Sequence, residues 1–337
     1  MKTLHHTLQT LFTLTILVLA ANSVFSQNIG GNGHKQGSVL FYNVYTSSVG
    51  SPDQQNTRLN ITNTAFSPVI VHWFFVDSGT CAIADTYTCL TGNQTYSFLA
   101  SDYDPGVTGY AVAVAVNGQG MPIDFDSLIG TEYIKFASGH QANLPAEALV
   151  LVNPAAAVFQ VADSGGTLVD LVFDGAGYER LPSDLALDNI PSLVDSNNTM
   201  LILNRIGGNL GELTSNIGTL GGLLYNDVEK GFSFSIRTSG CQVRTTLNDA
   251  FLRTSPPLSK VIGTGSSGWI RLFTVEKVDN SPQGGTTDAR AILGAMINFN
   301  PNAQTTGQGF NQGHNLHHLI YAPSAKLRMP VIVPPTC

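Results

Sequence analysis

Apolar and polar side chains alternate with a period of two through much of the chain after the first 37 residues. Successive side chains of a β-strand point to opposite faces, so this alternation is typical of sheets with one buried face. Clusters of Gly, Pro, Asn, Asp or Ser separate many of the segments and indicate turns. The candidate strands of the first part of the chain, rich in Val, Ile, Tyr, Phe and Thr, are 38–45, 57–63, 69–76, 95–100, 109–117, 132–137 and 148–152.

A second set of candidate strands follows the small-residue segment 153–166, which could hold a domain junction, although 158–161 within it could itself be a strand. Helical periodicity is weak, and the one short candidate helix, 144–151, competes with the strand at 148–152. The pattern therefore predicts an all-β protein with two tandem antiparallel β-sandwich domains of immunoglobulin-like type. The second set of strands is 168–173, 199–205, 222–225, 232–238, 242–247, 269–277, 291–299 and 319–322.

Weak internal repeats support the tandem arrangement. Four pairs of segments match in the same order along the two halves, and one pair brings two cysteines into register. The pairs are HWFFVDSGTC (72–81) with FSFSIRTSGC (232–241), GYAVAVAV (109–116) with GWIRLFTV (268–275), TRLNITN (57–63) with TMLILNR (199–205), and GHQANL (139–144) with GHNLHHL (313–319). They predict two related sandwiches.

The first residues have the features of a secretory signal peptide. An apolar run at 11–21 is too short to span a membrane, and Val24 and Ser26 suit the −3 and −1 positions of a cleavage site. Cleavage there would leave Gln27 as the first residue of an exported chain. The expected organisation is a signal peptide at 1–26, a flexible segment at 27–37, one β-sandwich at 38–155 and a second at 156–337.

The charge of the chain mainly excludes certain binding partners. Charged residues make up 12% of the chain, against roughly 25% in ordinary soluble domains, and the formal net charge is −7 without any Lys/Arg cluster. Nucleic-acid binding and attraction to anionic membranes both need basic side chains, so neither is expected. A weakly charged, Gly-rich surface offers little self-repulsion and permits assembly with other proteins.

The four cysteines are Cys81, Cys89, Cys241 and Cys337. In an exported chain, paired cysteines usually form disulfides, and the Cys81–Cys89 spacing suits neither a CxxC redox motif nor a zinc knuckle. We predict a Cys81–Cys89 disulfide that joins two strand ends across a short loop. Cys241 and Cys337 would then be free to pair with each other and tie the C-terminal tail to the second domain.

Two pairs of aspartates are candidates for calcium binding. Asp102 and Asp104 lie in SDYDPG, and Asp124 and Asp126 lie in IDFDS. Calcium takes several oxygen ligands, and alternate residues of a strand share a face, so each pair could converge on one ion. The alternative is that these side chains cap turns. No other cofactor is expected.

Histidines and tyrosines give two further candidates. HNLHH (314–318) brings His314, His317 and His318 together, but no carboxylate lies near them in the sequence, so ordinary loop histidines are the alternative to a metal site. Six tyrosines of the first half could either stack on sugar rings or fill the core. They are Tyr42, Tyr45, Tyr87, Tyr96, Tyr103 and Tyr110.

Residues 38–149 resemble a set of secreted bacterial proteins of uncharacterised function. The resemblance is carried by the VHWFFVDSGTC and ADTYTC stretches, by LASDYDPGVTGY (99–110) and by SGHQANL (138–144). It implies export and a β-sandwich fold, and it implies no catalytic or binding residues.

Together these features predict a secreted or cell-surface protein, structural or adhesive, that acts through contacts with itself or with other extracellular proteins. The alternative is a carbohydrate-binding module, with or without calcium. A secreted hydrolase ranks third, because titratable groups are scarce and no catalytic motif appears. We expect no enzymatic activity.

Overall fold

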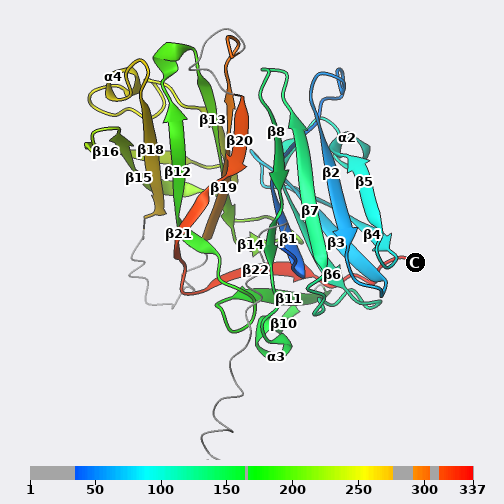
Figure 1. The fold of residues 1–337 in the computed structure, drawn as a ribbon. Helices are drawn as coiled ribbons and strands as arrows, with labels where there is room; N and C mark the ends of the chain where they lie inside the picture. The colour runs from blue at the N-terminus through cyan, green and yellow to red at the C-terminus, as the bar shows by residue number, and fades with distance from the viewer. Residues whose placement is uncertain (1–34, 164–165, 276–290, 304–310, 337) are drawn as a thin grey trace, which may run out of the picture. The chain divides into compact units, whose positions relative to one another are not determined.

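The computed structural model describes residues 35–163, 166–275, 291–303 and 311–336. The expected signal peptide and most of the expected flexible segment lie outside the described residues. Residues His34–Cys337 form one compact unit, shown in Figure 1. Antiparallel sheets dominate it, which confirms the prediction of an all-β protein.

The first half of this unit contains a five-stranded sheet of order β4-β3-β6-β1-β9 and a four-stranded sheet of order β5-β2-β7-β8. A short helix, α2 (Ala100–Tyr103), follows β5. The strands are β1 (Val39–Thr46), β2 (Asn56–Asn63), β3 (Val69–Asp77), β4 (Ile83–Leu90), β5 (Thr95–Leu99), β6 (Thr108–Val116), β7 (Leu128–Lys135), β8 (Gln141–Pro145) and β9 (Glu147–Leu149).

The second half contains a five-stranded sheet of order β16-β15-β18-β12-β21 and a four-stranded sheet of order β17-β13-β19-β20. Two short helical turns, η2 (Leu193–Asp195) and α4 (Leu258–Val261), lie in its connections. The strands are β12 (Pro182–Pro191), β13 (Asn198–Ile206), β15 (Gly218–Asn226), β16 (Gly231–Thr238), β17 (Gln242–Thr246), β18 (Ser267–Thr274), β19 (Ala291–Phe299), β20 (Gln312–Asn315) and β21 (His317–Tyr321).

A fifth sheet, of order β10-β11-β22-β14, completes the fold. Its strands are β10 (Val158–Asp163), β11 (Gly166–Phe173), β14 (Gly208–Asn209) and β22 (Ala325–Pro330), and α3 (Pro154–Ala157) precedes β10. Leu171 and Leu327 of this sheet share one buried cluster with Phe41 of β1 and Leu293 of β19. The fifth sheet therefore packs against strands of both halves.

Each half has its own core between its two sheets. In the first half, Trp73 of β3 and Tyr42 of β1 face Leu59 and Ile61 of β2. In the second half, aliphatic side chains of β12, β15 and β18 face those of β13 and β19. Two sheets that bury their alternate residues against each other form a sandwich, because each sheet has one apolar face.

The two halves have the same strand order. If β12 is taken as the counterpart of β1, and β13 and β15–β21 in turn as the counterparts of β2–β9, then the strands of each sheet in the second half follow the order of the matching sheet in the first half. Strand β14 has no counterpart in this comparison. A local irregularity agrees as well. In β1 the register with β6 shifts between Tyr42 and Tyr45, opposite Gly109. In β12 the register with β18 shifts between Leu187 and Ile190, opposite Gly268. A β-bulge thus lies at the same place in both halves.

The order differs from the immunoglobulin arrangement in its flanking strands. In an immunoglobulin domain the first strand lies in the same sheet as the second and fifth. Here β1 lies beside β6 in the sheet of β3, while β7 pairs with β2. Strand β4 differs too, because it pairs with β3, whereas the fourth immunoglobulin strand lies beside the fifth. Only the pairs β2–β5 and β3–β6 match the neighbours of the immunoglobulin order.

Several strands were missed by the pattern of the sequence. They are β4, β8, β12, β14, β20 and β22. The repeat that put Cys81 in register with Cys241 is wrong, because it aligns β3 with β16, whereas the matching strand of the second half is β15. The other three sequence matches join strands that do correspond.

A buried polar network joins the two halves at the bulge of β1. The side chain of Asn204 donates to the backbone oxygen of Asn43 at 2.8 Å, and Gln242 donates to the side-chain oxygen of Asn204 at 2.8 Å. The Asn43 side chain also donates to Asn315 at 3.1 Å. Apolar residues of β7 and β8 pack beside this network against β13 and β19.

Glu132 of β7 is fully buried and accepts the backbone N–H of Val44 in the bulge. Burial raises the pKa of Glu132 well above its usual range, because desolvation outweighs the hydrogen bonds from the backbone of Val44 and Asn43. The folded protein therefore holds this proton at pH values where an unfolded carboxyl group has lost it.

Linkage then fixes the sign of a pH effect. A carboxyl with a raised folded-state pKa binds more protons when folded, so the free energy of unfolding falls as pH rises above about 4.3, the unfolded pKa of Glu. Glu132→Gln removes this titration. We expect its stability relative to wild type to improve steadily as pH rises from 4 towards neutrality, measured by urea unfolding. The exposed substitution Glu212→Gln is the control, and parallel pH curves for wild type and Glu132→Gln would contradict the assignment.

Candidate functional site

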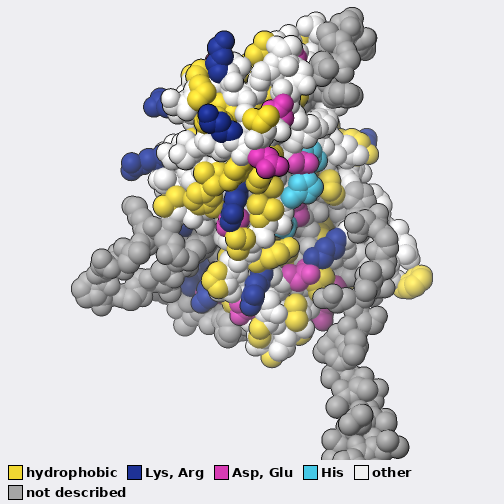
Figure 2. Space-filling view, turned by 60° about the vertical axis from the view of Figure 1, so that its left-hand side comes forward, with side chains coloured by type: hydrophobic (Ala, Val, Ile, Leu, Met, Phe, Trp, Pro, Cys, Tyr) yellow, Lys and Arg dark blue, Asp and Glu magenta, His cyan; other side chains and the backbone are white. Residues whose placement is uncertain are grey.

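The outer face of the five-stranded sheet of the second half carries aromatic side chains. Trp269 of β18 stacks on Tyr225 of β15, with ring centroids 4.6 Å apart and planes 14° from parallel. The ring of Phe273 covers Gly221, where an added Cβ would lie 2.4 Å from the ring. Alternation explains the arrangement, because the residues between these, such as Ile270, point into the core. Figure 2 shows apolar side chains gathered on one face of the molecule, with histidines and carboxylates beside them.

An ion pair crosses this face next to the rings. Arg271 of β18 donates two hydrogen bonds to Asp184 Oδ2, at 2.5 and 3.1 Å. The Asp184 side chain is 13% exposed, so this pair is partly desolvated. The outer face therefore combines flat apolar surface with charged groups held in fixed positions.

The bulge of β12 presents Asp188 at the edge of this face. Asn189, the next residue, has a positive φ of 48°, and a Cβ on Gly268 opposite the bulge would lie 2.6 Å from the Tyr225 carbonyl oxygen. A bulge re-aims the side chain that it carries. Here the extra residue turns the Asp188 carboxylate away from the regular strand positions.

Two histidines approach this carboxylate from the crossing between two sheets. His314 is on β20 of the four-stranded sheet, and His317 is on β21 of the five-stranded sheet. Leu316 between them is buried, and its backbone N–H donates to the Gly294 oxygen at 2.8 Å. Because Leu316 is anchored in the core, the chain turns around it with one histidine on each side.

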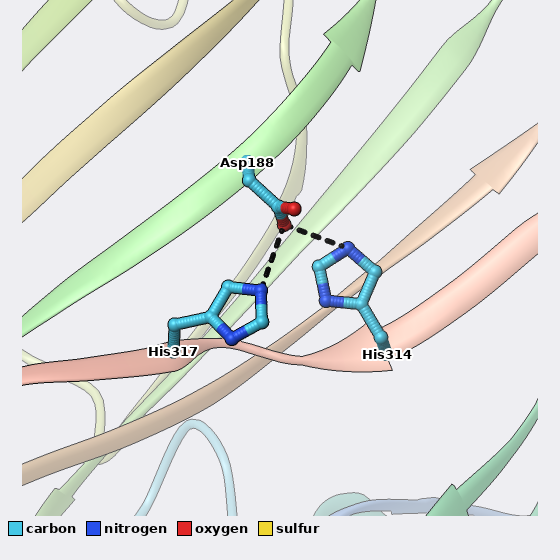
Figure 3. Close-up of side chains that lie close together, drawn as sticks. All are labelled: Asp188, His314 and His317. Atoms are coloured by element: carbon cyan, nitrogen blue, oxygen red, sulfur yellow. Dashed lines mark ion pairs between the residues drawn. The ribbon is translucent and has the colours of Figure 1, made fainter.

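Both imidazoles point at the same oxygen, as Figure 3 shows. The Nε2 atoms of His314 and His317 each lie 3.3 Å from Asp188 Oδ1. Among the described residues, this is the group of three metal-ligand side chains whose donor atoms lie within 4.8 Å of one another. The sequence pointed to the histidines and missed Asp188, which is more than 120 residues away along the chain.

A cleft of about 720 Å³ lies beside β21. It is bordered by β9 of the first half, where Glu147 Oε1 lies 3.7 Å from His318 Nε2. The ion pair of Lys35 and Glu179, at 2.5 Å, lies on its wall. Both β9 and β21 are the last strands of their five-stranded sheets. The lining residues are Lys35, Glu147, Ala148, Leu149, Val152, Gly175, Glu179, Arg180, Leu293, His318 and Tyr321.

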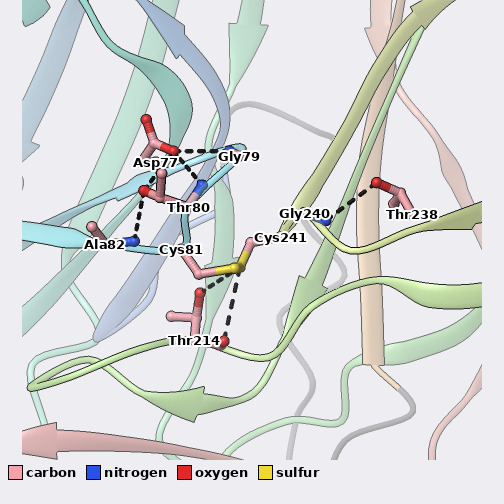
Figure 4. Close-up of a disulfide and its surroundings, with 9 residues drawn as sticks. All are labelled: Asp77, Gly79, Thr80, Cys81, Ala82, Thr214, Thr238, Gly240 and Cys241. Atoms are coloured by element: carbon pink, nitrogen blue, oxygen red, sulfur yellow. Dashed lines mark hydrogen bonds between the residues drawn. A yellow bond between two sulfur atoms is a disulfide. The ribbon is translucent and has the colours of Figure 1, made fainter.

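The predicted Cys81–Cys89 and Cys241–Cys337 pairings are wrong. Cys81 is bonded to Cys241, across 160 residues, with the Cα atoms 5.5 Å apart (Figure 4). Cys89 is also disulfide-bonded, and Cys337 lies outside the described residues.

Local structure explains why Cys81 turns towards the second half. Asp77 Oδ1 accepts the backbone N–H groups of Gly79 and Thr80, which tightens the turn after β3, and Cys81 has a φ of 63°. The backbone N–H of Cys241 then donates to the Ser78 oxygen at 2.9 Å. Backbone pairing thus brings the two cysteines together, and their spacing along the sequence has no part in it.

Three of the four aspartates predicted for calcium accept hydrogen bonds within the fold. Asp102 Oδ2 accepts the Leu99 N–H at 3.1 Å at the start of α2, and Asp104 accepts the Tyr45 hydroxyl. Asp126 Oδ1 accepts the Ser38 hydroxyl at 2.6 Å and the Leu151 N–H at 3.0 Å. Asp124 is exposed. These four do not form a group of three ligands within the described part of the chain, so the structure gives the calcium prediction no support.

The tyrosines of the first half mostly serve the fold. Tyr42, Tyr45 and Tyr110 are fully buried. The hydroxyl groups of Tyr96 and Tyr103 are hydrogen-bonded to each other at 2.9 Å, and that of Tyr87 donates to the Ile332 oxygen at 2.9 Å. The stacked and partly exposed pair suited to a flat ligand is instead Tyr225 and Trp269, in the second half.

Comparisons with known proteins found no matching protein-family model, no similar curated protein and no similar solved structure. Within the residues described, no helix has the length and apolar character needed to cross a membrane.

The disulfide gives a stability prediction. Because it closes a 160-residue loop, replacing both cysteines (Cys81→Ser with Cys241→Ser) should lower the free energy of unfolding by about 2–5 kcal/mol. Each single substitution removes the same bond, so either should cost nearly as much as the double one in denaturant unfolding. Additive effects of the two single substitutions would contradict the pairing.

Proposed function

We propose that this is an exported protein built from two tandem copies of one β-sandwich, and that it works by binding rather than by catalysis. The identical strand orders and the shared bulge support the tandem copies. The pairs β2–β5 and β3–β6, which match two neighbouring pairs of the immunoglobulin order, support an immunoglobulin-like core with rearranged outer strands. The signal-peptide features and the disulfides support an extracellular or cell-surface location.

Our preferred function is structural or adhesive, through assembly with a second copy of the chain. The observation that carries it is the free edge of β21, which within the described residues pairs only with β12. Three consecutive apolar residues of this strand are exposed: Leu319 (43%), Ile320 (48%) and Tyr321 (51%). An edge strand without Lys or Pro is a template for strand addition.

The surroundings of β21 favour this use. The strand borders the cleft shared with β9, so an added segment would find sheet edges on two sides. The low charge of the chain adds little repulsion between two copies. A shared sheet edge would bury the exposed apolar residues, which supplies the driving force.

The alternative function is glycan binding, favoured by one separate observation. The stacked Tyr225–Trp269 pair, beside the Arg271–Asp184 ion pair, offers a flat apolar surface with polar groups at its border. Sugar rings have apolar faces that stack on aromatic side chains and hydroxyl groups that hydrogen-bond to charged ones. Calcium dependence and a hydrolase activity have no comparable support.

Assembly is tested by a charge at the edge. We expect purified wild-type protein to form concentration-dependent oligomers in size-exclusion chromatography with light scattering. Ile320→Lys should shift the protein to monomer, because strand addition would then bury a charge. Val228→Lys, at a site that is 73% exposed in the β15–β16 turn, is the matched control and should behave as wild type. If the wild-type protein is monomeric at all concentrations, the assembly proposal is wrong.

Glycan binding is tested on an array of oligosaccharides. Trp269→Ala should abolish any retention seen with wild type while leaving the fold intact, because this ring is on the outer face. Tyr133→Ala, another exposed aromatic on β7, should bind as wild type does. Retention that survives Trp269→Ala would exclude this surface, and loss of retention in EDTA that calcium chloride reverses and zinc chloride does not would restore a role for calcium.

A further inference from the structure

We propose that Asp188, His314 and His317 together bind one transition-metal ion of the zinc class. This inference goes beyond the proposed function and does not rest on it, since neither strand assembly nor glycan binding needs a metal. It rests on the geometry of the three side chains, on an unsatisfied oxygen among them and on the tautomer of one histidine.

The distances fit a metal coordination shell. Zinc is bound tetrahedrally, with ligand atoms about 2.0–2.1 Å from the ion, so neighbouring ligand atoms lie about 3.3–3.4 Å apart. Asp188 Oδ1 is 3.3 Å from Nε2 of His314 and 3.3 Å from Nε2 of His317. Two edges of the tetrahedron are therefore already formed, and the third is within 4.8 Å.

Hydrogen bonds do not account for the arrangement. Asp188 Oδ1 is buried among its neighbours and has no hydrogen-bond partner, although two imidazole nitrogens face it. A buried carboxylate oxygen without a partner is costly, and native proteins rarely leave one. A cation between the three atoms would satisfy the oxygen and both nitrogens at once.

The tautomer of His314 is the one that a metal requires. Its Nδ1 lies 2.8 Å from the Asn315 carbonyl oxygen, which can only accept a hydrogen bond, so the proton is on Nδ1. In the neutral imidazole the lone pair is then on Nε2, the atom that faces Asp188. A backbone carbonyl that holds the far nitrogen of a metal-binding histidine is the usual outer partner of such ligands.

The donor set selects the class of ion. Two imidazole nitrogens and one carboxylate oxygen suit zinc, copper, nickel or cobalt, whereas calcium and magnesium take mostly oxygen ligands. The His317 side chain is 62% exposed and that of Asp188 is 51% exposed, so an ion can enter from solvent. Three protein ligands leave one tetrahedral position open to water or to a ligand from another molecule.

The site also links separate parts of the second half. Asp188 and His317 come from β12 and β21 of the five-stranded sheet, and His314 comes from β20 of the four-stranded sheet. An ion held by all three would fasten these sheets together where the chain crosses between them. Metal binding to the folded state alone should therefore raise the melting temperature.

The test is isothermal titration of untagged full-length chain, freed of metal with a chelator, with zinc chloride. We expect one ion per chain, and a dissociation constant at least about tenfold higher for His317→Ala and for Asp188→Asn. His318→Ala is the matched control, because this neighbouring histidine faces Glu147 and the cleft, and it should bind zinc as wild type does.

Cobalt gives a second readout that a change in folding cannot mimic. A tetrahedral site with two nitrogen ligands and one oxygen ligand should give visible absorption bands on addition of cobalt chloride. These bands should be lost in His317→Gln, a substitution that leaves the core unchanged because the His317 side chain is exposed. Circular dichroism confirms that the variants fold. The proposal is overturned if wild type binds no zinc, or if His318→Ala weakens binding as much as His317→Ala does.

Discussion

The fold depends on the burial of polar groups where the two sandwiches meet. The bulge of β1 turns backbone N–H groups and the Asn43 side chain out of the regular sheet ladder, and buried groups of this kind must find partners. Glu132 accepts the N–H groups, while Asn204 and Gln242 satisfy the Asn43 oxygens. These partners come from β7, β13 and β17, so the network is complete only when both halves are in place.

The Cys81–Cys241 bond reinforces the same junction, since Cys241 directly precedes Gln242 in the sequence. The fifth sheet adds a shared apolar layer with residues from β1 and β19. The junction therefore combines hydrogen bonds, a covalent bond and apolar contact. At the equivalent bulge in β12, the Asp188 side chain is directed to two histidines of its own half. One structural irregularity thus serves cohesion in the first half and offers a binding group in the second.

Much of the fold follows from local pattern. Strands with clear alternation or strong apolar runs, such as β3, β6 and β19, were predicted within a few residues. Strand β12 was missed because its residues Asp184 and Asp188 and its terminal prolines interrupt the pattern. Strand β20 was missed because its polar, histidine-containing residues resemble a loop, whereas the end of β21 was predicted as the strand 319–322. Two of the three candidate metal ligands, Asp188 on β12 and His314 on β20, therefore lie on strands that the sequence pattern missed, and His317 lies just before the predicted part of β21.

The sequence by itself determined the sheet-rich class of the protein, the approximate strands and the conspicuous histidines, because these depend on side-chain periodicity and residue type. Only the tertiary structure decided which cysteines pair, which aspartate joins the histidines and which aromatic rings face solvent. Those outcomes depend on strand order and on bulges, which are set by long-range pairing and the satisfaction of buried backbone groups. These outcomes cannot be inferred from spacing along the chain. Cys81 is therefore bonded to Cys241, 160 residues away, rather than to the nearby Cys89.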